Sequence, residues 1–274
     1  MNWEAWFRLS RLGGAPTALS ASLAGALLGP YPIDISLLAC LCISLGLYTL
    51  GMVSNDVLDI EKDRRLRPDR VLASGLISKE HALLFLALLM LGITLLSCFL
   101  RPQQRFCFGL CAIFILLYNG PLKSQFWLSS ACIGMARSLN FFGAYGPVQF
   151  GAIELYLFLI IFCHILLIML IAQGEDESAP LAPSAWIAWA LQISCVAILC
   201  KAWVMPWMVW TGGHLWMYRN SNRQLRPKLV GLLVASLTLL EACVLISKNH
   251  LIPAALLLGL YVFGKTLRRK YPVG

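Results

Sequence analysis

Long apolar runs alternate with short polar connections along most of the chain. The apolar residues are continuous within each run and do not alternate with polar ones, which indicates helices and not strands. A helix needs about 20 mostly apolar residues to cross a membrane. The expected spans are residues 15–29, 35–54, 80–100, 105–119, 126–146, 152–173, 185–206, 228–247 and 251–267. The pattern predicts an all-α integral membrane protein with about nine transmembrane helices, forming a single domain over residues 1–274.

The last third of the chain leaves the number of spans open. The stretch 185–218 is long for one span, and Lys201, Pro206 and the pair Gly212-Gly213 interrupt it. An extra half-span in this stretch would make the number even. The basic C-terminus would then lie on the same side of the membrane as the N-terminus.

Lysine and arginine near the ends of spans indicate orientation, because they accumulate in cytoplasmic loops. Arg8 and Arg11 precede the first span, the 55–79 loop carries six basic residues, and the first loop carries none. A nine-span count puts ten basic residues on each side, so we follow the N-terminal signal, which usually dominates. We expect the protein in the inner (plasma) membrane of a bacterium, with the N-terminus and the 55–79 loop in the cytoplasm.

Composition agrees with a membrane protein. Of the 274 residues, 59% are hydrophobic and only 13% are charged, too few to cover the surface of a soluble domain. The net charge of +9 is better explained by orientation and anionic lipid headgroups than by nucleic acid. The ten cysteines are scattered through apolar runs without a C-x-x-C pair, which is typical of buried thiols that pack as small apolar groups.

A regular set of acids follows the second span. Asn55 is followed by Asp56, Asp59 and Asp63, whose spacing i, i+3, i+7 places them on one face of a helix. Carboxylates at a helix C-terminus repel one another and the helix dipole unless a cation joins them. Mg²⁺ suits such a site, since it uses one or two carboxylates together with substrate phosphates.

An arginine cluster comes directly after the acids. Arg64, Arg67 and Arg70 supply guanidinium groups whose geometry matches phosphate. Acids and arginines at a membrane surface are what metal-assisted binding of a lipid diphosphate requires. The spacing alone leaves open a second interpretation, a solvated loop whose charges pair with one another.

The segment N-D-V-L-D-I-E-K-D, followed by R-P-D-R-V-L-A-S-G-L-I-S, resembles the first signature of the UbiA superfamily of intramembrane prenyltransferases. Y-N-G-P-L-K, residues 118–123, is similar to the family's Tyr-to-Lys motif after the fourth span. The segments M-A-R-S-L-N-F-F-G and Q-G-E resemble the EboC-like branch of the superfamily.

This resemblance implies a helical bundle with a central cavity and a lipid-side opening, in which a prenyl diphosphate binds through Mg²⁺. The allylic C–O bond ionises there, and an acceptor captures the cation. By resemblance the metal ligands are Asn55, Asp56, Asp59 and Asp63, with Glu175 and Asp176 from the second acidic motif, and the diphosphate ligands are Asn55, Arg67, Tyr118 and Lys123. The chemistry and position of Arg70, Arg137 and Asn140 add them to the expected diphosphate ligands. The catalytic set is Asp56, Asp59, Asp63, Lys123 and Glu175.

The second acidic motif of the family departs from its D-x-x-x-D form in this chain. Q-G-E-D-E-S stands there, and Ala179 and Pro180 occupy the positions four residues after Glu175 and Asp176. The expected second metal site is therefore reduced to Glu175 with a neighbouring acid. A short acidic loop without metal is the alternative.

Two polar residues lie inside the fifth span. Arg137 and Asn140 are three residues apart and share one helix face. Ionisable residues inside a membrane usually face a cavity and are functional, so Arg137 is expected to contact the diphosphate or the acidic loop. A structural pair with a carbonyl or a buried acid is the alternative.

The sequence predicts a Mg²⁺-dependent prenyltransferase acting on an aromatic or other small acceptor of unknown identity. Its partners are a prenyl diphosphate, that acceptor and membrane lipid, without nucleic acid. One rival is a catalytically weakened relative that binds a prenyl lipid or helps to export a metabolite, which the reduced second motif favours. Another is a prenyl-chain cyclase or hydrolase.

Overall fold

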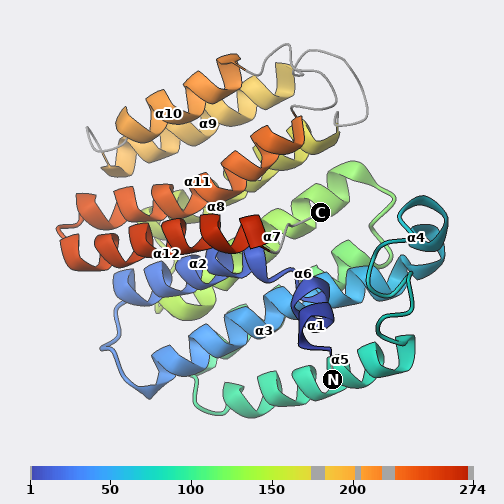
Figure 1. Ribbon diagram of the computed structural model, residues 1–274. Helices are drawn as coiled ribbons and strands as arrows, with labels where there is room; N and C mark the ends of the chain where they lie inside the picture. Colours follow the sequence, from blue (N-terminus) through green and yellow to red (C-terminus); the bar gives the residue numbers. More distant parts are fainter. Residues whose placement is uncertain (1, 174–182, 201–204, 218–225, 271–274) are drawn as a thin grey trace.

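The structure, a computed structural model, describes residues 2–173, 183–200, 205–217 and 226–270. Every regular element in these ranges is helical, which confirms the predicted all-α class (Figure 1). The elements are α1 (Trp3–Leu9), the 3₁₀ turn η1 (Leu12–Gly14), α2 (Ala15–Leu28), α3 (Ile35–Leu58), α4 (Ile60–Leu66), α5 (Lys79–Ser97), α6 (Pro102–Asn119), α7 (Phe126–Tyr145), α8 (Ala152–Gln173), α9 (Pro183–Cys200), α10 (Met205–Met217), α11 (Arg226–Ser247) and α12 (Leu251–Lys270).

Helix α2 lies at the centre of the bundle and packs against α3, α7, α11 and α12 (Figure 1). Its sequence is rich in alanine, serine and glycine, the small residues that let membrane helices approach closely. A Cβ atom at Gly25 would lie 2.2 Å from the carbonyl oxygen of Phe141 on α7. The close approach of α2 and α7 therefore requires glycine at this position.

The outer surface of the bundle is suited to lipid. Helix α5 exposes Leu84, Leu88, Leu91 and Leu95, each more than half accessible, along one face. Among the described helices, α3, α5, α8 and most of α11 are both long and apolar enough to cross a membrane, and several others are shorter and apolar. Together with their parallel arrangement (Figure 1), these helices indicate a membrane bundle.

Helix α10 is an additional element within the stretch where the sequence left the count open. Gly231 near the start of α11 lines a pocket with Pro16 and Thr17 at the start of α2. Gly264 near the end of α12 also lies against Pro16. Because α11 starts and α12 ends beside the start of α2, α10 must return the chain across the bundle after α9. The C-terminal end of α12 therefore lies at the same end of the bundle as the start of α2.

This arrangement predicts the relative sidedness of three lysines. In a background without native thiols, Lys62→Cys and Lys265→Cys are expected to react with an impermeant thiol reagent from the same side of the membrane. Lys248→Cys, between α11 and α12, is expected to react from the opposite side. Labelling of the Lys248 position from the same side as Lys62, with Lys265 reacting from the opposite side, would contradict a crossing by α10.

Candidate active site

The acids that follow the second long helix lie at a break between two helices. Helix α3 ends at Leu58, Asp59 has φ −90° and ψ 2°, and α4 begins at Ile60. The sequence pattern predicted that Asp56, Asp59 and Asp63 lie along one face of a single helix. This prediction is wrong for Asp63, which belongs to the separate short helix α4. Hydrogen bonds from Asp59 N to Asn55 O (3.0 Å) and from Asp63 N to Asp59 O (2.8 Å) continue the winding across the break. The acids consequently stay close together but face two directions.

One direction is toward Lys123, in the turn after α6. Its ammonium group donates hydrogen bonds to Asn55 Oδ1 (2.7 Å) and to Asp59 Oδ2 (2.5 Å). The Lys123 and Asp59 side chains are 32% and 20% accessible, so this pair remains open to solutes. Two side-chain oxygens, one from Asn55 and one from Asp59, thus converge on one ammonium group at the end of the bundle.

The other direction is toward two arginines. Arg70 donates to Asp56 Oδ1 (3.2 Å) and to Asp63 Oδ2 (2.9 Å), and Arg11 donates to Asp56 Oδ1 (2.7 Å). Asp56 and Asp63 are only 7% and 6% accessible. These two acids therefore belong to a closed ion-pair cluster that ties α3, α4, the following loop and the N-terminal arm together.

Arg11 is a site residue that the sequence analysis used only for orientation. Its backbone lies in the left-handed region, with φ 46° and ψ 50°, which costs of order 1 kcal/mol for a residue other than glycine. The Tyr48 hydroxyl donates a hydrogen bond to the Arg11 carbonyl oxygen (2.8 Å) and holds this conformation. Its position just before the first expected span was the feature of the sequence that could have indicated a role for Arg11 in the site.

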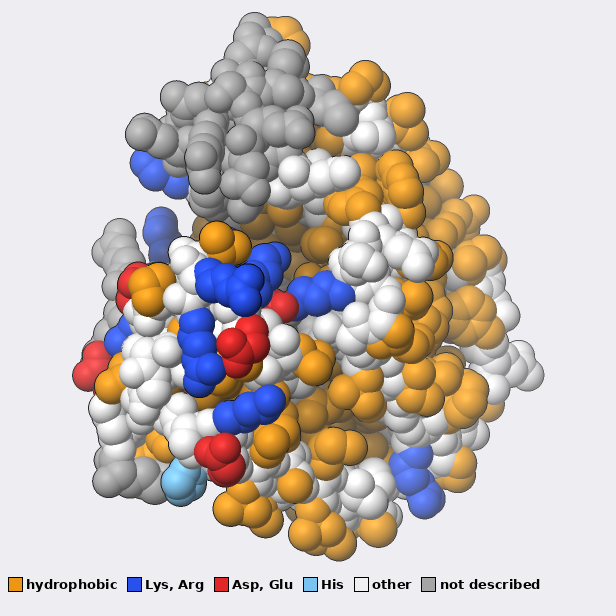
Figure 2. Space-filling model, turned by 90° about the vertical axis from the view of Figure 1, so that its right-hand side faces the viewer, with side chains coloured by type: hydrophobic (Ala, Val, Ile, Leu, Met, Phe, Trp, Pro, Cys, Tyr) orange, Lys and Arg blue, Asp and Glu red, His pale blue; other side chains and the backbone are white. Residues whose placement is uncertain are grey.

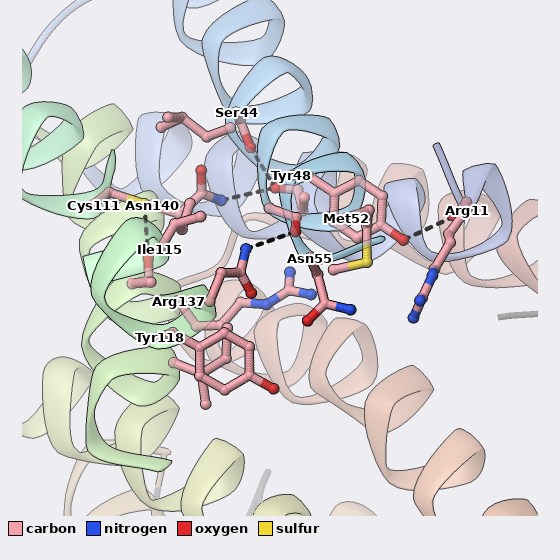
Figure 3. A pocket seen from close by; sticks show the side chains of 16 residues that line it. Arg11, Ser44, Tyr48, Met52, Asn55, Cys111, Ile115, Tyr118, Arg137 and Asn140 are labelled. Atoms are coloured by element: carbon pink, nitrogen blue, oxygen red, sulfur yellow. Dashed lines mark hydrogen bonds between the residues drawn. The ribbon is translucent and has the colours of Figure 1, made fainter. Parts of the chain in front are cut away.

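A cavity opens beside these groups, between α2, α3, α6 and α7. It contains about 670 Å³ of empty space, including space open to the surroundings. Arg11, Asn55, Tyr118 and Arg137 line its polar end, and Ser44 lies at its deep end (Figure 3). On α3, the rise from Asn55 to Ser44 is about 16 Å. The cavity therefore leads from the charged cluster into the apolar bundle, as expected for a prenyl diphosphate site.

Arg137 brings positive charge into this cavity. Its guanidinium carbon lies 5.8 Å from the centre of the Tyr48 ring, within the range of a cation–π contact. Figure 3 shows the guanidinium group extending toward Asn55. Arg137 forms no salt bridge with any residue that the structure describes. A partly buried cation at a cavity wall is suited to an anionic ligand.

The remaining predicted site residues are placed less favourably. Arg67 caps the end of α4 and is exposed, with no ion pair to a described residue. Asn140 lines the cavity one helical turn deeper than Arg137. Glu175 and Asp176 lie outside the described residues. Figure 2 shows acidic and basic side chains gathered at the α4 end of the bundle, while hydrophobic side chains cover much of the remaining view.

The metal-binding oxygens at this site suit Mg²⁺ only if phosphate oxygens complete its coordination shell. Within the described ranges, no three His, Cys, Asp or Glu side chains are placed to hold a metal ion. Asn55 and Asp59 nevertheless present two oxygens to a single cation, the Lys123 ammonium. Since Mg²⁺ typically takes one or two carboxylates and completes its shell with phosphates and water, this pair is an adequate protein contribution.

Comparison with known proteins identifies the family of this chain. The sequence profile of the UbiA prenyltransferase family matches residues 15–218. A digeranylgeranylglyceryl phosphate synthase from Methanoregula boonei is 26% identical over 234 residues, which are 78% of this chain and 81% of that protein. A second protein of that name, from Thermococcus sibiricus, is 31% identical over 125 residues, covering 45% of this chain and 43% of its own length.

Solved structures share the fold. The structure of a digeranylgeranylglyceryl phosphate synthase superposes with a TM-score of 0.66 at 21% identity, covering 92% of this chain and 98% of the other. A UbiA homologue from Archaeoglobus fulgidus, solved with GPP and Mg²⁺, gives a TM-score of 0.59 at 14% identity, covering 95% and 99% of the two chains. The family match spans most of the chain, and the fold agrees with it. This protein belongs to the UbiA prenyltransferase family.

Proposed function

We propose that this prenyltransferase binds an allylic prenyl diphosphate through Mg²⁺ at the polar end of the cavity and transfers the prenyl group to a small acceptor. The observation that carries the proposal is the convergence of Asn55 Oδ1 and Asp59 Oδ2 on Lys123, at the end of a cavity that Arg137 also lines. Oxygen donors for a hard cation and basic groups for phosphate therefore meet at one place.

The reaction breaks the allylic C–O bond, and the electron pair leaves with the diphosphate. Bound Mg²⁺ supplies neutralisation of the charge that develops on the diphosphate. Lys123, Arg137 and Arg11 supply fixed positive charge at the same end, the electrostatic contribution that is usually largest in catalysis. The Tyr48 and Tyr118 rings, which also line the cavity, are placed to stabilise positive charge on the allylic carbon. Capture by the acceptor forms the new bond and releases the acceptor proton.

The direction of the site in the membrane is part of the proposal. The N-terminal arm, the 55–79 loop and the end of α12 share one end of the bundle, and each carries two or more basic residues. Because basic residues accumulate on the cytoplasmic side, we place this end in the cytoplasm. A nine-span count gave equal numbers of basic residues on the two sides of the membrane. A crossing by α10 moves the basic C-terminus to the side of the 55–79 loop, so the numbers are no longer equal.

The names of the relatives suggest a donor with which to begin. Digeranylgeranylglyceryl phosphate carries two geranylgeranyl groups, so geranylgeranyl diphosphate is the first donor to test, with geranyl and farnesyl diphosphate beside it. Purified protein in nanodiscs, with lipid extract as acceptor source, is expected to release pyrophosphate only when Mg²⁺ is present. Mass spectrometry of the lipids is expected to show a new prenylated product. Absence of turnover with all three donors would overturn the assignment of a transferase.

One observation favours a second candidate, a prenyl-lipid-binding protein. Asp56, Asp59 and Asp63 are all paired with basic residues of the same chain, so the cluster is electrostatically balanced without a metal. Tight Mg²⁺-dependent binding of prenyl diphosphate without any turnover would select this candidate.

Basic residues around the site are expected to differ in importance. Lys123→Ala should weaken diphosphate binding by about 1.5–3 kcal/mol, the range for a hydrogen bond to a charged group, or roughly 10- to 150-fold. Arg67→Ala should weaken it less, because Arg67 is exposed and lies outside the ion-pair cluster. Arg64→Ala, which removes only a surface pair with Glu61, is the control. Binding of a prenyl diphosphate in nanodiscs measures all three, and equal losses in the three variants would contradict this ranking.

A further inference from the structure

The pocket that Gly231 lines with Pro16 and Thr17 is a groove between the start of α2, α11 and α12, and we name it the α12 groove. These three helices pack against one another (Figure 1). The groove contains about 480 Å³ of empty space, including space open to the surroundings. It shares no lining residue with the cavity beside Asn55. The proposed reaction therefore gives this groove no occupant.

The wall of the α12 groove is largely apolar and belongs to the membrane-spanning part of α11. Leu232 and Ala235 on α11 and Leu260 on α12 line it, and all three are partly exposed. A Cβ atom added at Gly231 would meet no described atom within 4 Å, so the groove is open at this point. From Gly231 to Thr238, which lines the deeper part, α11 rises about 10 Å. A hydrocarbon chain is the kind of ligand that such a wall accepts.

Positive charge lies at one end of the α12 groove. Lys265 on α12 lines it and is exposed, and the exposed Lys228 stands one turn before Leu232 on the same face of α11. Neither lysine forms an ion pair with any residue that the structure describes. Tyr261, one turn before Lys265, also lines the groove, and tyrosine is enriched where a membrane meets water. The charged end of the groove therefore lies at the membrane surface, with the hydrocarbon wall directly behind it.

The combination of charge and apolar wall decides which class of ligand fits. A small soluble anion would use the lysines but not the wall, and a neutral lipid would use the wall but not the lysines. Among the described residues that line the groove, none carries a carboxylate or a side-chain amide, so the groove lacks the oxygens that hold a Mg²⁺-bound diphosphate. Basic pockets between membrane helices on the cytoplasmic side bind the headgroups of anionic lipids.

We propose that the α12 groove binds a phospholipid with a net negative headgroup, with its phosphate beside Lys265 and one acyl chain along the apolar wall. The lipid belongs to the leaflet on the side of the 55–79 loop. It contacts α2, α11 and α12 together, so its binding stabilises the packing of the last two helices on the start of α2. The site does not depend on the proposed transfer reaction, because it and the prenyl diphosphate cavity are lined by different residues.

Two matched lipids test the requirement for a negative headgroup. Phosphatidylglycerol and phosphatidylcholine with identical acyl chains differ in the net charge of the headgroup. The delipidated protein in a non-ionic detergent is titrated with each lipid, and its melting temperature is followed against the mole fraction of lipid in the micelles. The wild type is expected to half-saturate at an at least about fivefold lower mole fraction of phosphatidylglycerol, equivalent to about 1 kcal/mol from one lysine. Equal half-saturation by the two lipids would overturn the proposal and indicate that the groove accepts any acyl chain.

Lysine variants locate the headgroup. Lys265→Gln is expected to raise the half-saturating mole fraction of phosphatidylglycerol about fivefold and to leave that of phosphatidylcholine unchanged. Lys248→Gln is the control, because Lys248 is also exposed and also has no ion pair with a described residue, but lies at the opposite end of α11. It is expected to behave as the wild type. Equal losses in the two variants would assign the preference to the net charge of the protein and overturn the site.

Glycine variants locate the acyl chain. Gly231→Leu puts a side chain into the open space of the groove and is expected to abolish the saturable rise in melting temperature with phosphatidylglycerol. Gly259→Leu on α12 is the control, because its added Cβ also meets no described atom within 4 Å and Gly259 does not line the groove. An unchanged response in Gly231→Leu would place the lipid elsewhere and contradict the proposal. The comparison of the exposed lysines remains decisive if Gly231→Leu does not fold.

A donor measurement separates the lipid site from the prenyl diphosphate cavity. Mg²⁺-dependent binding of geranylgeranyl diphosphate is expected to be equal in the wild type and in Gly231→Leu. Loss of donor binding in Gly231→Leu, with retained binding in Gly259→Leu, would assign the groove to the prenyl donor and overturn the lipid proposal. A wild type that prefers phosphatidylglycerol but binds no prenyl diphosphate would overturn the proposed function and leave the lipid site standing.

Discussion

Asp59→Ala is expected to abolish Mg²⁺-dependent binding of prenyl diphosphate and to lower turnover at least about 100-fold, or about 2.7 kcal/mol of barrier. Asp59 provides the accessible carboxylate that converges with Asn55 on the Lys123 position. Without it, the described residues offer a metal only the neutral amide oxygen of Asn55 at this point. Binding is measured in nanodiscs with and without Mg²⁺, and turnover by pyrophosphate release.

Two controls make this prediction specific. Asp59→Asn keeps the size and a hydrogen-bonding oxygen but removes the charge, and should show nearly the same loss. Glu61→Gln changes a nearby acid that forms only a surface pair with Arg64, and should leave binding unchanged. Full Mg²⁺-dependent binding by Asp59→Asn would exclude a metal ligand role for this carboxylate.

Asp56→Ala is expected to act chiefly on stability. Asp56 is buried and accepts hydrogen bonds from Arg11 and Arg70, so its loss leaves two largely buried cations with fewer partners. Removing one member of a buried ion pair is strongly destabilising, and we expect a loss of about 3 kcal/mol in the free energy of unfolding. Thermal denaturation of the detergent-purified protein measures it.

The contrast between the two aspartates is the informative result. Arg11→Ala should reproduce part of the stability loss, because it breaks the same pair, and Asp59→Ala should reproduce little of it. The distinction between Asp59 as a ligand-binding acid and Asp56 as a structural acid would be refuted if Asp56→Ala were as stable as the wild type and lost as much metal-dependent binding as Asp59→Ala.

The positions of most helices could be predicted because each long apolar run in the sequence corresponds to a helix. A helix of the described residues overlaps each of the nine apolar runs, and the family match and solved structures agree with the expected bundle. Helix α10 was visible only as an ambiguity, since Pro206 and Gly212-Gly213 disturb a pattern that is otherwise apolar. Its crossing follows from contacts of α11 with α2, which a hydropathy profile does not contain.

The residues of the site could be predicted from the sequence. Which acid faces Lys123 and which acids pair with arginines could not. Spacing placed Asp56, Asp59 and Asp63 on one stripe, whereas the helix break at Asp59 separates the acid that faces Lys123 from those that face arginines. Arg11 approaches Asp56 from a distant part of the chain, so local spacing gave no sign of the pairing.

Unsatisfied hydrogen bonds are a further property that sequence does not display. Asn119 lies inside the Y-N-G-P-L-K segment, and Asn140 follows Arg137 by three residues. Only the structure shows that their nitrogens bond to Gly51, Ser54 and Ala18 while their oxygens remain unpaired. A donor or acceptor that packing leaves without a partner is a three-dimensional property, which the spacing of residues along the chain does not predict.

Metal-dependent binding at the Asn55, Asp59 and Lys123 group is tested most directly by calorimetric titration of the wild type with geranylgeranyl diphosphate in nanodiscs, with excess Mg²⁺ and with EDTA. The proposed site predicts binding at least about 100-fold tighter with Mg²⁺, equivalent to about 2.7 kcal/mol, and loss of that difference in Asp59→Ala. Equal affinity in Mg²⁺ and EDTA for the wild type would contradict it.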